Sequence, residues 1–371
     1  MKHRFEVLDI FRGIFASMVV FFHMSAFSNT VILNNNLVLN SDLFVDFFFV
    51  LSGFVITYTH QSMVHAKDMG LFYKKRLFRL YPLHFIMLMV FVFIELVKHF
   101  FVGHIQVNQL NNANNNVLTF FSNLFLVHSI KLPGVTDVSW NIPSWSISAE
   151  MTCYLLFGLV IWLIHKAHIY KLRNIVYTIV VIGALVIFFN ARPGQFEFTR
   201  SFDFGFLRAW IGFFTGSICF NLFINTREKV ITLPAALFNA LELVCIAAML
   251  VMVYEGGILK PYGYIYEVMF FASIYVFAFE KGFISTLFKK INILKNIGTY
   301  SYSIYMTHAF LLSIFNIVFI RLLKLPATSY AYLFIVNYAL IYVVSKWTYK
   351  HIELKFQWKK KKEDKVPKGV K

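Results

Sequence analysis

Long apolar stretches recur along the whole chain and are separated by short polar segments. A helix needs about 20 mostly apolar residues to cross a lipid bilayer. The pattern predicts ten spans, at residues 9–27, 43–59, 81–101, 146–165, 173–190, 205–225, 232–254, 264–282, 297–320 and 330–349. Residues 117–130 are too few and too polar to cross, so we predict an interfacial or re-entrant segment there.

The distribution of positive charge predicts the orientation of these spans. With a cytoplasmic N-terminus, 25 of the 35 Lys and Arg residues fall in cytoplasmic segments and 6 in outer segments. This bias follows the positive-inside rule, and one span more or fewer would destroy it. We therefore predict that both termini are cytoplasmic. The first span is too long for a signal peptide and lacks a small-residue cleavage site, so we expect it to be retained.

One domain accounts for nearly the whole chain. We predict an all-α integral-membrane domain over residues 1–355, a bundle of ten transmembrane helices, followed by a basic cytoplasmic tail over residues 356–371. The tail is expected either to touch anionic lipid or to be a solvated end without a specific partner. The run Asn111–Asn116 is expected to be flexible, within a long outer loop.

The composition excludes a soluble fold. Hydrophobic residues make up 58% of the chain and charged residues only 14%, against about 25% charged residues in ordinary soluble domains. The mean hydropathy is +0.65, so lipid must be part of the solvent. The net charge of +17 fits basic loops facing anionic lipid, and we predict no nucleic-acid partner because no soluble module is present to hold one. The three cysteines lie in apolar stretches and are expected to pack as small hydrophobic side chains.

The first predicted span carries two ionisable residues on one face. Arg12 and His23 are eleven residues apart, which brings them to within about 20° of the same side and about 16 Å apart along the axis. Asp9 lies one turn from Arg12 and is positioned to orient its guanidinium. Ionisable groups within spans are costly and usually functional. The alternatives are an arginine that reaches the headgroups and a hydrogen-bonded interior histidine.

Two carboxylates are expected at the same depth as His23. Asp46 lies about one turn inside the second span, and Glu150 about one turn inside the fourth. A neutral histidine beside a carboxylate in a water-poor site is a suitable general base for a hydroxyl group. Ser146 shares a helix face with Glu150, and Ser148 belongs to the adjoining face. Capping or cross-linking of helices is the alternative role for both acids.

Basic and aromatic residues alternate before the third span, which we expect to begin at Pro82 because the first turn of a helix tolerates proline. Arg76 and Arg79 lie one turn apart, so both can face one ligand, and guanidinium groups bind phosphate in a bidentate manner. The alternative is an ordinary basic helix lying on anionic lipid.

The ninth span contains Ser301, Tyr305 and His308 at helical spacing, with Tyr302 beside them. Such a polar stripe must face the bundle interior, either to support the site or to form interhelical hydrogen bonds. Gly53 is expected to allow a close approach between helices. The chain has no zinc-binding, nucleotide-binding or hydrolase motif, so we predict no metal and no tightly bound cofactor.

Several of these segments together resemble the acyltransferase-3 family of integral-membrane O-acyltransferases. The matching pieces occur in family order over nearly the whole chain: Arg12-x10-His23, Phe44–Phe54, Arg76-x-x-Arg79 leading into Pro82, Pro143–Glu150, Gly298–His308 and Tyr349–Glu353. The family usually has proline after the closing glutamate, where this chain has Leu354.

The resemblance implies transfer of an acetyl or similar acyl group from cytoplasmic acyl-coenzyme A. The implied acceptor is a hydroxyl of a bacterial surface polysaccharide or a lipid-linked glycan outside the cytoplasm, with separate glycan-assembly proteins as possible partners. It implies a catalytic role for His23, as base or transient acyl carrier, supported by Glu150 and Asp46. Arg12, Arg76 and Arg79 would bind the phosphates of the donor.

Two other classes of function stay open at the level of sequence. A proton-coupled secondary transporter would use His23, Asp46 and Glu150 as a relay, although the chain lacks the inverted repeat typical of such transporters. A scaffold or lipid-binding protein would not need clustered ionisable groups.

Overall fold

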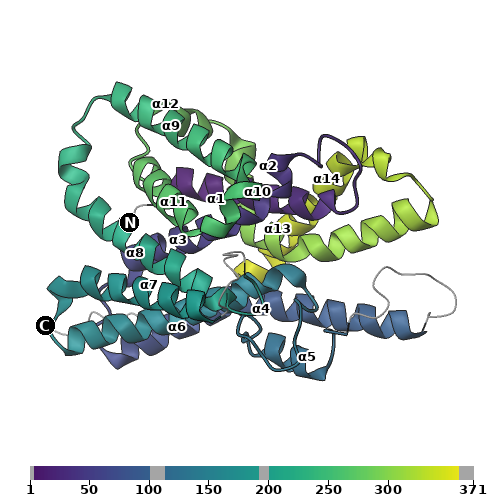
Figure 1. Cartoon of the computed structure of the whole chain (residues 1–371), viewed down its shortest axis with the longest axis horizontal. Helices are drawn as coiled ribbons and strands as arrows, with labels where there is room; N and C mark the ends of the chain where they lie inside the picture. The colour runs from purple at the N-terminus through teal and green to yellow at the C-terminus, as the bar shows by residue number, and fades with distance from the viewer. Residues whose placement is uncertain (1–3, 101–112, 192–199, 359–371) are drawn as a thin grey trace, which may run out of the picture.

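A computed structural model describes residues 4–100, 113–191 and 200–358. These residues are mostly helical and contain no β-strand (Figure 1). The α-helices are α1 (Glu6–Ser25), α2 (Asn36–Leu39), α3 (Phe44–His60), α4 (Ala66–Phe100), α5 (Val117–Leu124), α6 (Trp145–Lys166), α7 (Arg173–Asn190), α8 (Gly205–Val230), α9 (Ala235–Tyr254), α10 (Gly256–Leu259), α11 (Tyr264–Phe277), α12 (Phe283–Phe288), α13 (Asn292–Asn316), α14 (Tyr330–Thr348) and α15 (Leu354–Phe356).

Nine helical stretches among the described residues are long and apolar enough to cross a membrane. Each coincides with a span predicted from the sequence, which confirms an all-α, multi-pass membrane protein. The remaining predicted span, at 264–282, corresponds to α11, which has only 14 residues and is shorter than a bilayer requires. Ten crossings, and cytoplasmic locations for both ends, therefore stay predictions.

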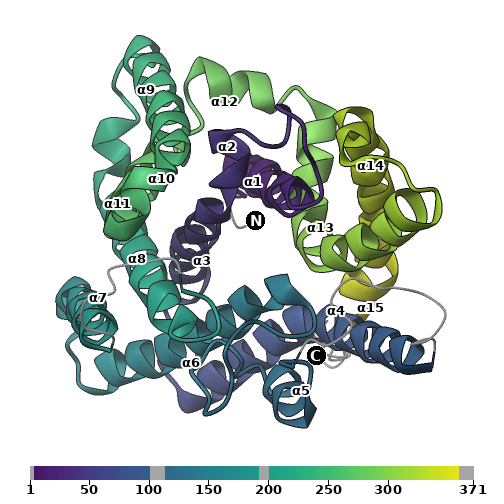
Figure 2. The same cartoon turned by 45° about the vertical axis from the view of Figure 1, so that its right-hand side comes forward.

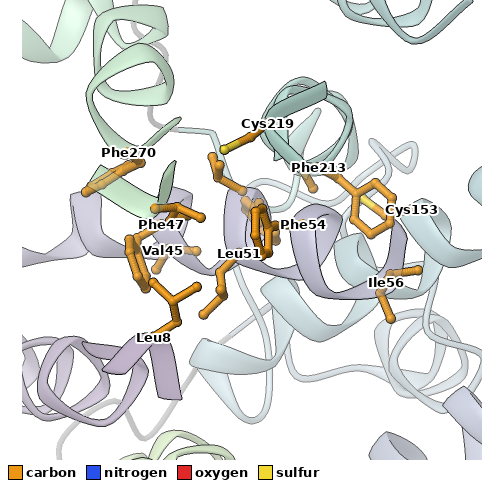
Figure 3. Packing of buried hydrophobic residues seen from close by; sticks show 14 of the residues in the cluster. Leu8, Val45, Phe47, Leu51, Phe54, Ile56, Cys153, Phe213, Cys219 and Phe270 are labelled. Carbon is orange, nitrogen blue, oxygen red and sulfur yellow. The ribbon is translucent and has the colours of Figure 1, made fainter. Parts of the chain in front are cut away.

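The helices α1 and α3 lie inside a ring formed by the other long helices (Figure 2). Most of the apolar window is buried in both, at 61% for α1 and 67% for the stretch Ser41–His60 that contains α3. Figure 3 shows buried side chains packed around α3. The ring centre of Phe47 lies 5.6 Å from that of Phe270 in α11, and the ring centre of Phe54 lies 5.5 Å from that of Phe220 in α8. The three cysteines are buried and unpaired, as expected for small core side chains. Functional groups on these inner helices are thus shielded from lipid.

Two pairs of helices come into backbone contact through glycine. A Cβ atom on Gly53 of α3 would lie 1.8 Å from the carbonyl oxygen of Phe213 in α8, so the expected close approach at Gly53 is confirmed. Between α1 and α13, a Cβ on Gly13 would lie 2.4 Å from the backbone nitrogen of Gly298. Small residues at such crossings let helices pack at the shortest possible distance. The second contact fixes α1 against α13 beside Arg12 and one turn before Ser301.

The helix that carries the paired arginines begins earlier than expected. We predicted a start at Pro82, but α4 begins at Ala66 and contains Pro82 in its interior. Proline has no N–H group, so one helical hydrogen bond is lost there, but packing of the helix on both sides compensates. Consequently Arg76 and Arg79 belong to the same continuous helix as the span, rather than to a separate helix on the lipid surface.

The described part of the asparagine run makes specific contacts. Residues 111 and 112 lie outside the described part, but the amide oxygen of Asn115 accepts a hydrogen bond of 2.7 Å from the backbone of Trp140. Asn116 caps α5 through a 3.0 Å hydrogen bond from the Thr119 N–H group. This part of the asparagine run is therefore tied to the fold. The segment at 117–130 contains α5, which packs beside α4. The tail beyond residue 358, including Lys359–Lys362, lies outside the described residues.

The departure from the family pattern at Leu354 has a local structural consequence. Tyr349–Glu353 form a π-helical turn, and the N–H of Leu354 donates a hydrogen bond to the carbonyl of Tyr349. Proline at this position would lack that donor. Leucine therefore lets the helix continue into α15.

The contact between α1 and α13 gives a first testable prediction. Gly13→Ala should lower the free energy of unfolding by about 1–3 kcal/mol, because the added methyl group forces two packed backbones apart. Thermal unfolding of the purified protein in detergent, followed by circular dichroism, measures this change. Gly183→Ala on α7 is the matched control, because its methyl group meets nothing within 4 Å. Equal melting temperatures for the two variants would contradict the close contact.

Candidate functional site

Five helices line a cavity of about 110 Å³. Its wall is formed by α1, α3, α4, α6 and α13, so it lies between the inner helices and the ring. Charged and hydroxyl groups are concentrated in this wall, among apolar side chains. The polar residues that line it are Arg12, Ser52, Arg76, Arg79, Ser146, Glu150, Tyr154, Ser301, Tyr302 and Tyr305.

Arg12 reaches the cavity from α1 and is held mainly by α13. Its Nε donates a hydrogen bond of 2.8 Å to the hydroxyl of Ser301. Asp9 lies 3.3 Å from an Nη atom of Arg12, the neighbour expected from their spacing. The same carboxylate accepts a hydrogen bond of 2.7 Å from Arg4, which raises the pKa of Arg4. Because Asp9 is shared between two guanidinium groups, it neutralises Arg12 only in part.

Arg76 and Arg79 enter the cavity together from α4. The guanidinium carbon of Arg76 lies 5.7 Å from the ring centre of Tyr154, and its Nε is buried without a hydrogen-bond partner. Within the part of the chain that the structure describes, neither arginine forms an ion pair with a carboxylate. Arg12 lines the same cavity, so the three predicted donor-binding residues are brought together.

Glu150 lies at this arginine-rich part of the cavity, not beside His23. One of its carboxylate oxygens accepts hydrogen bonds from Ser52, at 2.7 Å, and from Tyr154. The side chain is directed from α6 toward α3 and shares the cavity wall with Arg76 and Arg79. The expected contact between Glu150 and the imidazole of His23 is therefore wrong.

The polar stripe of α13 connects the cavity with His23. Ser301 holds Arg12 as described, and the hydroxyl groups of Tyr305 and Ser146 are 2.9 Å apart. Further along the helix, His308 Nε2 lies 3.3 Å from His23 Nδ1. The stripe thus faces the polar face of α1 along its length, which confirms that it points into the bundle.

Tyr302 adds a link to α4. Its hydroxyl group donates a hydrogen bond of 2.6 Å to the backbone carbonyl of Leu80, directly after the two arginines. This bond fixes the position of α4 relative to α13 beside the cavity.

Asp46 occupies a different site. Its two oxygens accept hydrogen bonds of 2.7 and 2.8 Å from Arg208 of α8, and both side chains are almost fully buried, at 1% and 3% exposed. A carboxylate in a low-dielectric interior is stable only beside a cation, and Arg208 supplies it. Glu267 of α11 is also buried in this region, and neither of its oxygens has a hydrogen-bond partner. The expected support of His23 by Asp46 is therefore wrong in geometry.

Ser148 also lies away from the cavity. Its hydroxyl donates a hydrogen bond of 2.8 Å to the carbonyl of Leu126 and accepts one of 3.1 Å from the N–H of Ser129. Ser148 therefore anchors the loop that follows α5, whereas Ser146, on the neighbouring face of α6, lines the cavity.

Sequence reasoning missed several members of this arrangement. Ser52 and Tyr154 donate hydrogen bonds to Glu150 but were not among the predicted site residues. Tyr154 lies one turn after Glu150 on α6, whereas Ser52 reaches Glu150 from α3. Arg208 lies within the predicted span at 205–225, and a charge within a span is a signal for a buried partner. Glu353 accepts a hydrogen bond from Ser303 of α13, and its charge acts on Arg79. The segment Tyr349–Glu353 was among the pieces that resemble the family, but its partner on α13 was not predicted.

The fold and the site together define a multi-pass membrane protein with a cation-lined internal cavity. Comparison with known proteins names the class more closely. A family model described as an acyltransferase domain matches residues 5–346, and the chain belongs to this family, acyltransferase-3.

The other comparisons are more limited. An uncharacterized protein of Haemophilus influenzae is 29% identical over 151 residues, which cover 39% of this chain and 57% of that protein. The chain thus spans little more than half the length of this relative. No solved structure matches the chain.

The buried ion pair gives the second prediction. Asp46→Ala should lower the free energy of unfolding by about 3–5 kcal/mol, because it leaves the Arg208 guanidinium buried without its partner. The double variant Asp46→Ala with Arg208→Leu should lose less than the sum of the two single variants. Thermal unfolding in detergent measures all three. Strictly additive losses would show that the two side chains do not interact.

Proposed function

We propose that the protein is a membrane O-acyltransferase, and specifically an O-acetyltransferase. In this proposal it takes an acyl group from cytoplasmic acyl-coenzyme A and transfers it to a hydroxyl of a glycan outside the cytoplasm, in the bacterial inner membrane. The observation that carries the proposal is the meeting of Arg12, Arg76 and Arg79 in one cavity. Tyr305 lies in the same wall, and His308, one turn further along α13, contacts His23. Membership in an acyltransferase family supports the reaction class.

The cavity has the chemistry that a phosphate-rich donor requires. Guanidinium groups form planar, bidentate hydrogen bonds with phosphate, and Arg76 has a buried Nε that no protein group satisfies. Glu150 is the one carboxylate in the cavity wall, against three arginines. Asp9 and Glu353 act on Arg12 and Arg79 from outside this wall, so the guanidinium groups that face the cavity can attract an anion. A phosphate bound there would satisfy the free guanidinium donors.

The separation between Arg12 and His23 suits a long, thin donor. They lie on one face of α1, about 16 Å apart along its axis. Between them, Tyr305 and Ser146 present hydroxyl groups at the cavity wall. A donor whose phosphates bind the arginines can therefore extend a flexible arm along α1 and α13, with its thioester toward His23.

Transfer of the acyl group then requires one proton movement at each end. The acceptor hydroxyl oxygen attacks the thioester carbonyl carbon, and His23 removes the hydroxyl proton as general base. The carbon–sulfur bond breaks, and the departing thiolate takes up a proton. If His23 instead carries the acyl group transiently, its nitrogen attacks first and the hydroxyl attacks the acyl-imidazole second. Both routes give an ester and free coenzyme A.

The catalytic assignment gives the third prediction. His23→Ala should reduce acyl transfer by about 10²–10⁴-fold, because general-base catalysis contributes rate factors of that size. The measurement is alkali-labile labelled acetyl in the glycan fraction of membranes that contain the protein and receive labelled acetyl-coenzyme A. His65→Ala, an exposed residue after α3, is the control. Equal labelling by wild type and His23→Ala would contradict the assignment.

Donor binding gives the fourth prediction. Arg76→Gln and Arg79→Gln should each raise the KM for acetyl-coenzyme A about tenfold or more, because a hydrogen bond to a charged group contributes about 1.5–3 kcal/mol. The apparent affinity for the acceptor should change little. Arg173→Gln is the matched control, because Arg173 contacts Tyr170 and Asn221 away from the cavity. A change confined to acceptor preference would count against the phosphate role.

The same assay separates the transporter alternative. A proton-coupled transporter would move its substrate across sealed membrane vesicles without releasing coenzyme A. Coenzyme A release that matches the amount of ester formed supports transfer.

A further inference from the structure

We infer that His308 fixes the neutral tautomer of His23 and leaves His23 Nε2 as the atom that receives the proton of the acceptor. This inference rests on the proposed function for its chemical meaning, but its geometry does not depend on it. His308 is fully buried on α13, and the two imidazole ring centres lie 4.9 Å apart. We treat His308 as a positioning residue.

The backbone determines the tautomer of His308. Its Nδ1 lies 2.7 Å from the carbonyl oxygen of Tyr305, one turn earlier in the same helix. A carbonyl oxygen only accepts hydrogen bonds, so Nδ1 must carry the hydrogen. In the neutral ring the other nitrogen, Nε2, then holds a lone pair. This lone pair points at His23, because Nε2 of His308 lies 3.3 Å from Nδ1 of His23.

The tautomer of His23 follows from two acceptors that converge on one atom. His23 Nδ1 lies 2.9 Å from the carbonyl oxygen of Val19 and faces the lone pair of His308. Both neighbours accept, so Nδ1 of His23 must be the donor and carries the hydrogen. Nε2 of His23 therefore holds a lone pair. Among the described residues it has no hydrogen-bond partner, and the side chain is partly exposed.

The opposite assignment creates two repulsive contacts. If Nε2 of His308 carried the hydrogen and donated it to His23, then His308 Nδ1 would direct a lone pair at the Tyr305 carbonyl at 2.7 Å. His23 Nδ1 would likewise direct a lone pair at the Val19 carbonyl at 2.9 Å. In that state each ring nitrogen and its carbonyl oxygen would direct lone pairs at each other, and both hydrogen bonds would be lost in a buried site. The chain of acceptors from Tyr305 through His308 to His23 thus selects one state.

This arrangement does for His23 what a carboxylate does in other catalytic histidine sites. The Nδ1 hydrogen is held, so Nε2 is the base that faces the acceptor hydroxyl. When Nε2 takes the proton, the imidazolium keeps its Nδ1–H bond to the lone pair of His308, and no second proton has to move. His308 therefore fills the position that the sequence suggested for Asp46 or Glu150.

A spectroscopic experiment tests the inference without any substrate. The full-length protein, labelled with ¹⁵N-histidine and held in lipid nanodiscs, is compared with His23→Asn to identify the His23 signals at neutral pH. Nitrogen chemical shifts distinguish a protonated from an unprotonated ring nitrogen. We expect His23 with hydrogen on Nδ1 and a bare Nε2. A bare Nδ1 in the wild-type protein would overturn the inference.

Variants at His308 supply the second readout. His308→Leu should add a population of His23 with hydrogen on Nε2 and slow acyl transfer at least about tenfold, part of the 10²–10⁴-fold that a general base contributes, with an unchanged KM for acetyl-coenzyme A. His308→Gln should restore part of both, since its amide oxygen can accept from Nδ1. His84→Leu is the matched control, because His84 is equally buried but bonds to Asn123 on another face. Equal tautomers in wild type and His308→Leu would overturn the role of His308.

The two proposals fail in different ways. If His23 has hydrogen on Nδ1 but no acyl transfer occurs, the proposed function is wrong and the role of His308 in fixing the His23 tautomer stands. If acyl transfer occurs and depends on His23 while Nδ1 of His23 carries no hydrogen, the proposed function stands and the tautomer inferred for His23 is wrong.

Discussion

The backbone contact between α1 and α13 is the constraint on which the site depends. Gly13 and Gly298 bring the two helices so close that neither can shift without a clash. Because the contact lies beside Arg12 on α1 and one turn before Ser301 on α13, it sets the register of the two polar stripes from one end. Arg12 then meets Ser301 at one end, and His23 meets His308 at the other. A looser crossing would separate both pairs, because side chains at hydrogen-bond distance tolerate little displacement.

The ionisable residues of the interior fall into two groups, those with an oppositely charged partner and those without one. Asp46 and Arg208 neutralise each other in a dry contact between α3 and α8, and they hold helices together as a buried pair does. Arg76 and Arg79 have no such carboxylate partner among the described residues and face a cavity. In a medium where unpaired charge is expensive, cations left without a partner are the ones prepared for a ligand. Whether a charged residue has an oppositely charged partner therefore distinguishes the structural pair from the arginines of the cavity.

The centre of the cavity combines a carboxylate with hydroxyl groups. Glu150 accepts hydrogen bonds from the hydroxyl groups of Ser52 and Tyr154. Neutral donors therefore stabilise this carboxylate in place of a direct ion pair with one arginine. The guanidinium groups nearby keep their donors available. Hydrogen bonds from neutral hydroxyl groups hold Glu150 in the cavity wall, and such bonds are weaker than a direct buried ion pair.

The sequence by itself determined the class of fold, because each membrane span must be apolar along its own length. It also determined that Arg12 and His23 share a face and that Ser301, Tyr305 and His308 form a stripe, since helical periodicity is local. Only the tertiary structure decided which stripe meets which. The rotation of α3 about its axis directs Asp46 to Arg208, and that of α6 directs Glu150 to Ser52. The residue that contacts His23 is His308 of α13. Partners across helices depend on rotation and crossing, and these follow from side-chain packing between distant segments, which no single span encodes.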